Sequence, residues 1–196
     1  MTVAKPRFSS FEEYLSYDDG TDNRYELIDG ELFVLPPESG LNTTIAAYLF
    51  VKMMEAGIPF HLIKLNCCEV QVPALRLRDA QNRYSDLVVL REDHVELTRS
   101  RLTIKLDMPP PQLIAEVVSP GRTNRDRDYI RKRDQYCRIG VQEYWIIDPQ
   151  QQTVLVLALE NAQYVEIGNF QGEQVISSRC FPAIQLTAGE VFAAAQ

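Results

Sequence analysis

A glutamate interrupts a short apolar run in the middle of the chain. The run Leu113–Val118, LIAEVV, carries Glu116 at its fourth position and is ended by Ser119-Pro120-Gly121. Successive side chains of a strand point to opposite faces, so this carboxylate either faces the core or lies where the sheet opens. Burying a carboxylate is costly unless a cation compensates its charge. The sequence therefore predicts a strand whose acid needs a positively charged partner.

A charged helical segment, expected from about residue 124 to 138, follows that run and precedes a second apolar run, Tyr144–Ile147. The order is therefore strand, turn, helix, strand. With Tyr129 at the centre of the apolar helix face, Lys132 and Tyr136 lie on the same side, at i+3 and i+7. Lys132 borders the stripe that packs on the sheet, as does Arg133. Four charged residues of the segment are expected to point more outward: Arg127, Arg131, Asp134 and Arg138.

Two further acids lie in apolar surroundings. Asp86 begins the stretch DLVVL, thirty positions before Glu116, and Glu26 precedes the turn Asp29-Gly30. Two carboxylates brought close together repel each other, and a divalent cation removes this conflict. Mg²⁺ commonly takes one or two carboxylates together with water and substrate phosphate. Asp86 and Glu116 are thus candidate metal ligands, and Glu26 is a further candidate ligand or an acid that positions a water.

Composition narrows the class of protein. The chain has 196 residues and suits a single domain, 1–196, and its apolar runs are far too short for a membrane span. Its four cysteines show no CxxC spacing, which favours reduced thiols in a cytoplasmic protein. A net charge of −7 argues mildly against a nucleic-acid partner. Residues 122–138 nevertheless contain seven cationic and three acidic side chains. Three of the cations are candidate contacts to a DNA backbone: Arg122, Arg125 and Arg127.

Periodicity and turn residues predict the remaining elements. Helices are expected over residues 8–16 and 41–57, and a further one capped by Thr187. Residues 75–82 are expected to form a polar turn and residues 93–105 a polar loop. Strands are expected in the hairpin 24–35, within 60–73, over 84–90, 153–159 and 162–167, and once more in the tail 174–196.

Five motifs together resemble a known family. They are YELIDGEL (25–32), SDLVVL (85–90), IAEVVSP (114–120), NRDRDYIRKRDQY (124–136) and GVQEYWIIDP (140–149), and they span about two-thirds of the chain. An acid in one strand, a glutamate in the next and a nearby lysine resemble the PD-(D/E)xK pattern of metal-dependent nucleases. In this order, the motifs resemble a bacterial family of unknown function described as restriction endonucleases.

The resemblance implies a restriction-endonuclease-like α/β fold, in which helices flank a mixed sheet, with its motif core at about residues 24–149. It assigns Asp86 and Glu116 as metal ligands, Lys132 as the catalytic lysine and Glu26 as a supporting acid. The implied reaction is hydrolysis of a DNA phosphodiester with Mg²⁺ or Mn²⁺, by a protein that acts as a homodimer. Tyr136 is expected to form a hydrogen bond near this site.

This sequence departs from the family pattern at two places. Ser85 stands where proline is usual, and Val118 stands where the wider superfamily has the lysine of its ExK motif. In the narrower family the lysine lies on the following helix, which Lys132 fits. Two other functions stay open: a nuclease-fold protein that binds nucleic acid or a protein partner without cutting, and a two-carboxylate hydrolase such as a glycosidase, which would give Lys132 no role.

Overall fold

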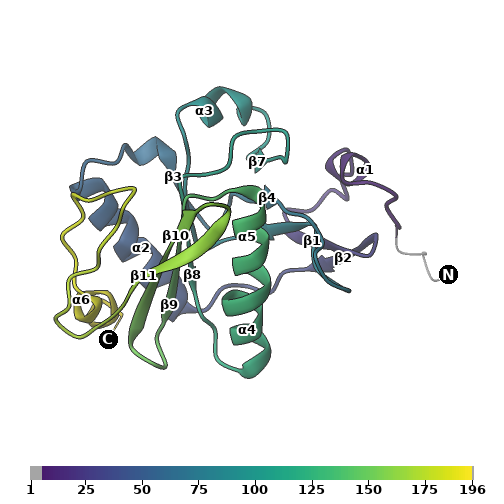
Figure 1. The fold of residues 1–196 in the computed structure, drawn as a ribbon. Coiled ribbons are helices and arrows are strands. Elements are labelled where there is room, and N and C mark those ends of the chain that lie inside the picture. The colour runs from purple at the N-terminus through teal and green to yellow at the C-terminus, as the bar shows by residue number, and fades with distance from the viewer. Residues whose placement is uncertain (1–5, 196) are drawn as a thin grey trace.

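The structure is a computed structural model that describes residues 6–195 (Figure 1). A six-stranded sheet with the order β11-β10-β9-β8-β6-β3 forms its centre. The pair β8–β9 is parallel, and the other four neighbouring pairs are antiparallel. The strands are β3 (Ile63–Leu65), β6 (Leu87–Val89), β8 (Leu113–Val117), β9 (Glu143–Asp148), β10 (Thr153–Glu160) and β11 (Gln163–Gln171). The expected mixed sheet of an α/β protein is thus confirmed.

Different helices cover the two faces of this sheet (Figure 1). One face packs against α2 (Gly40–Glu55) and α6 (Ala188–Ala193). The other face is covered by one helical segment that consists of α4 (Arg122–Asp126), the π-helical turn η2 (Arg127–Lys132) and α5 (Arg133–Ile139). In β8, Leu113, Ala115 and Val117 belong to the core on the α2 side, and Ile114 belongs to the core on the α5 side. The alternation along the strand therefore turns Glu116 toward α5.

The helix α2 follows from local sequence signals. The Ser39 side chain accepts a hydrogen bond from the backbone of Asn42 and so caps its N-terminus. Ile45, Leu49 and Met53 are spaced four residues apart and are all buried. Gly57 follows the helix with a φ of +91°, the left-handed conformation that glycine adopts without strain. The helix expected over 41–57 is confirmed.

Smaller elements flank the central sheet. The predicted hairpin is β1 (Tyr25–Ile28) and β2 (Glu31–Val34), joined by Asp29-Gly30 with both φ angles positive. A second small sheet has the order β5-β4-β7. The other elements are α1 (Phe11–Leu15), η1 (Phe60–Leu62), β4 (Glu69–Gln71), β5 (Asn82–Tyr84), α3 (Asp93–Leu97) and β7 (Thr103–Ile104). In the described part of the chain, no helix is long and apolar enough to cross a membrane.

Three expectations were wrong in detail. The strand expected over 84–90 is divided between β5 and β6, which belong to different sheets, because Ser85 and Asp86 leave the ladder at a bend. The loop expected over 93–105 contains α3 and β7. In the described tail, the extra strand is reduced to a single bridge between Val175 and Thr187, although Thr187 does cap α6 in a capping box.

The packing of β8 leads to a stability prediction. Leu113 is completely buried in the core on the α2 side, so Leu113→Ala should lower the free energy of unfolding by about 2–5 kcal/mol, measured by urea denaturation. Leu77 is 83% exposed, and Leu77→Ala should change it by less than about 0.5 kcal/mol. Equal losses for the two variants would contradict this assignment of the core.

Candidate active site

The two predicted metal ligands lie near each other, where β6 begins and β8 approaches its end. The register of β6 and β8 pairs Leu87 with Ala115. Asp86 directly precedes Leu87 at the bend before β6, and Glu116 directly follows Ala115 within β8. Both are buried, with 6% and 3% of their surfaces exposed. The backbone N–H of Val117 donates to Oδ2 of Asp86 at 2.7 Å, which fixes this carboxylate against β8. The two acids therefore share the sheet face that α5 covers.

The helix on that face supplies the partners of Glu116. The Lys132 Nζ lies 2.7 Å from one carboxylate oxygen of Glu116, and the Tyr136 hydroxyl donates to the other at 2.9 Å. Lys132 and Tyr136 are one helical turn apart, as their expected position on one helix face requires. Ser85, in the place where proline is usual, is hydrogen-bonded to the Tyr136 hydroxyl at 2.8 Å. Ser85 thus extends the chain of hydrogen bonds that orients Glu116.

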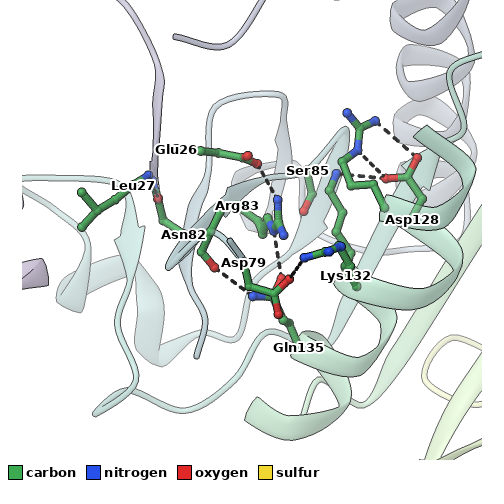
Figure 2. Close-up of polar contacts among 12 residues, drawn as sticks. Glu26, Leu27, Asp79, Asn82, Arg83, Ser85, Asp128, Lys132 and Gln135 are labelled. Carbon is green, nitrogen blue, oxygen red and sulfur yellow. Dashed lines mark hydrogen bonds and ion pairs between the residues drawn. The ribbon is translucent and has the colours of Figure 1, made fainter. Parts of the chain in front are cut away.

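Sequence reasoning missed Asp128, which is 1% exposed. Its Oδ1 lies 3.4 Å from Lys132 Nζ and 3.0 Å from Nε of Arg127 (Figure 2). Lys132 therefore lies between two buried carboxylates, those of Glu116 and Asp128. The available signal was the spacing, because an acid four residues before a lysine faces it on a helix.

Glu26 joins the site through a second buried cation. Arg83 is 3% exposed and donates from Nη1 to Oε1 of Glu26 at 3.0 Å and from Nε to Oε1 of Gln135 at 2.9 Å (Figure 2). Gln135 in turn donates to the backbone carbonyls of Pro73 and Ala80, at 2.8 Å each. This relay connects the hairpin β1–β2 to α5 and holds Glu26 at the edge of the site.

Five of these residues border one cavity of about 280 Å³. Its walls include all four predicted catalytic residues together with Arg127: Glu26, Asp86, Glu116, Lys132 and Arg127. The expectation that Arg127 points outward was wrong, because its ion pair with the buried Asp128 draws the guanidinium inward. Asn124 and Ser119 lie at the same cavity.

The other candidate substrate contacts have different surroundings. Arg122 is exposed and lies 3.8 Å from Asp126. Arg125 forms an ion pair with the buried Asp148, and its guanidinium carbon lies 4.5 Å from the ring centre of Tyr129. Tyr136 is completely buried, so its hydroxyl contacts Ser85 and Glu116 instead of solvent. Arg127 is the candidate that lines the cavity.

Charge dominates the chemistry of the site. Burial and the charge of Glu116 raise the pKa of Asp86 to about 8. Burial alone would lower the pKa of Lys132, but Glu116 and Asp128 outweigh it and raise that pKa, so Lys132 keeps its charge. The cluster combines four acids with three cations, and these are Glu26, Asp86, Glu116 and Asp128 against Arg83, Arg127 and Lys132.

This donor set fits a hard divalent cation. Asp86 and Glu116 offer carboxylate oxygens beside a cavity that has room for water and a phosphate, which is the usual environment of Mg²⁺. Within residues 6–195, no group of three or more histidine, cysteine, aspartate and glutamate side chains is arranged to hold a metal. Mg²⁺ is commonly bound through only one or two carboxylates and keeps several waters, so Asp86 and Glu116 suffice as its protein carboxylates.

The buried ion pair can be tested without a substrate. Lys132→Met leaves Glu116 and Asp128 buried without their ammonium partner, so the free energy of unfolding at pH 7 should fall by about 3–5 kcal/mol. Lys52→Met removes an exposed pair, in which Lys52 Nζ lies 2.8 Å from Glu55, and should cost less than about 1 kcal/mol. Urea denaturation measures both variants. A similar small loss for both would show that the buried pair does not form.

Comparisons with known proteins agree with this fold. The described structure is similar to a crystal structure from Anabaena variabilis described as a "putative nuclease belonging to DUF820". The TM-score is 0.67 at 16% sequence identity, with 94% of this chain and 98% of that chain covered, so the likeness concerns the fold. No curated protein matches the sequence. Residues 11–189 match the model of the Uma2 family, whose description is "Putative restriction endonuclease", and the chain belongs to that family.

Proposed function

We propose that this protein is a divalent-metal-dependent DNA endonuclease that hydrolyses phosphodiester bonds by a PD-(D/E)xK-type mechanism. The observation that carries this proposal is the meeting of Asp86, Glu116 and Lys132 at one cavity, from two strands and a helix. Membership of a family described as restriction endonucleases supports it, as does the nuclease description of the similar fold. A two-carboxylate glycosidase is less suited, because a charged lysine lies directly on one of the two acids.

Each side chain has a role in this proposal. Asp86 and Glu116 would hold Mg²⁺ or Mn²⁺ through their carboxylate oxygens, and Glu26 would position water at the edge of the cavity. When bound by these two acids, such a cation would supply Lewis-acid chemistry and compensate negative charge that develops during phosphodiester hydrolysis. Lys132 donates hydrogen bonds toward the attacking water or a phosphate oxygen. Arg127 lines the same cavity and its guanidinium matches a phosphate group.

Tyr136 and Arg83 contact the acids of the cavity but do not line the cavity themselves. Tyr136 is buried and holds Glu116 in place through its hydroxyl. Arg83 fixes Glu26 through an ion pair of 3.0 Å. Both are therefore positioning residues in this proposal. A homodimer would bring two such cavities to the two strands of a duplex.

A plasmid assay tests the reaction. Supercoiled DNA incubated with the full-length protein and Mn²⁺ or Mg²⁺ should be nicked or linearised. EDTA should abolish the reaction because it removes the cation that the acids would hold. Glu116→Gln and Asp86→Asn should each lower the rate by at least about a hundredfold, since each removes a carboxylate ligand. Gel electrophoresis over time gives the rates.

Glu31→Gln is the matched control, because it makes the same chemical change at an exposed position of β2. It should cleave at the wild-type rate. Equal cleavage by wild type and Glu116→Gln would indicate a contaminating nuclease and refute the proposal. Retarded DNA mobility without any cleavage would support the alternative of a nuclease-fold protein that binds without cutting.

A further inference from the structure

We infer that Asp128 is a positioning residue: its carboxylate pairs with the Lys132 ammonium when a divalent cation binds Glu116. The inference rests on the proposed function, because it concerns the metal ligands of the proposed endonuclease. Its basis is the position of the Lys132 ammonium, 2.7 Å from Glu116 and 3.4 Å from Asp128. One cation thus lies between two buried acids, only one of which is a proposed metal ligand.

Each carboxylate oxygen of Glu116 already has one partner in the protein. Lys132 occupies one of its carboxylate oxygens and the Tyr136 hydroxyl occupies the other. A divalent ion on the same carboxylate would lie close to the ammonium, and like charges repel strongly where water is largely excluded. This repulsion favours a position of Lys132 farther from Glu116 but still beside a charged partner, since an unpaired buried ammonium is costly.

Asp128 meets the requirements for that partner. It is 1% exposed, so its charge is little screened by solvent. Its Oδ1 also accepts from Nε of Arg127 at 3.0 Å, and its backbone carbonyl accepts from the Tyr144 hydroxyl at 2.9 Å, which together hold it still. A shift of Lys132 by a fraction of an ångström converts the contact of 3.4 Å into a normal hydrogen bond.

The position of Asp128 separates it from the proposed ligands. Among the described residues, the cavity is lined by Asp86, Glu116 and Lys132 but not by Asp128. Asp128 lies behind the lysine, one turn earlier on the segment where the helix widens into the π-helical turn η2. Such turns occur frequently at functional sites, where they set the direction of particular side chains. Asp128 therefore acts on the cation through Lys132.

Calorimetric titration with MnCl₂ tests this dependence in a double-mutant cycle. The proteins are the full-length wild type, Asp128→Asn, Lys132→Met and the double variant. Asp128→Asn should weaken Mn²⁺ binding about tenfold, because Lys132 then stays on Glu116. Lys132→Met should bind Mn²⁺ more tightly than wild type. In the Lys132→Met background, Asp128→Asn should change the affinity by less than about twofold.

Asp126→Asn is the matched control, because it removes the same charge from an exposed acid two residues earlier. It should leave the Mn²⁺ affinity unchanged within about twofold. Thermal melting with Mn²⁺ verifies that each variant is folded. If Lys132→Met does not fold, Lys132→Gln replaces it in the cycle, because it also removes the charge.

The outcomes separate this inference from the endonuclease proposal. Equal weakening by Asp128→Asn in both backgrounds would overturn the inference and make Asp128 a direct source of attraction for the cation. An unchanged affinity in Asp128→Asn would also overturn it. The predicted cycle without any DNA cleavage would support the inference and refute the endonuclease. A wild type that binds no Mn²⁺ would refute both.

Discussion

The charge of Glu116 is buried within a β-strand, and much of the surrounding structure compensates it. The strand β8 is buried along its whole length, so the Glu116 carboxylate is almost completely shielded from bulk water. Lys132 and Tyr136, one turn apart on the covering helix, each contact one of its oxygens. If the helix moved away, Glu116 would be left as an uncompensated buried charge, which is strongly destabilising. These contacts therefore favour this position of the helix on the sheet. The compensating lysine is also the proposed catalytic one.

A second constraint comes from Asp86, which lies at the bend where the chain leaves one sheet and enters another. The backbone carbonyl of Asp86 accepts from the N–H of Asn66, and its carboxylate accepts from Val117. The bend therefore places the acid just before the start of β6, where it lines the same cavity as Glu116. A continuous strand would have left this acid inside the ladder. The division into β5 and β6 is thus part of what forms the site.

Other buried acids show why burial alone does not identify a functional residue. Glu143 is completely buried in β9, yet its oxygens accept from Trp145, Ser178 and two backbone N–H groups. It fixes the chain near Ser178 and lies at none of the walls of the cavity that holds Glu116. Glu116 differs because a lysine and a second carboxylate meet it at that cavity. The combination with Asp86 and Lys132, more than the burial, supports the metal-binding proposal.

The sequence by itself determined many of the elements and the family. Apolar runs, helical periodicity, caps and turns predicted β8, α2 and the hairpin β1–β2, because these signals act over a few residues. Motif order was enough to identify the family, and helical spacing placed Lys132 and Tyr136 on one face. The same helical spacing relates Asp128 to Lys132, but Arg83 could not be assigned in this way. Arg83 is joined to Glu26 across 57 positions of the chain, and only the folded structure brings them together.

Tertiary structure also decided which charged residues face inward. Local periodicity placed Arg127 outside, whereas its pairing with a buried acid turns it to the cavity. The same periodicity could not divide residues 84–90 between two sheets, because a bend is stabilised by contacts with Asn66 and Val117 from distant segments. Sequence periodicity records which residues are apolar, but the partner of a buried charge is set by strand register and helix packing. Those are properties of the assembled fold.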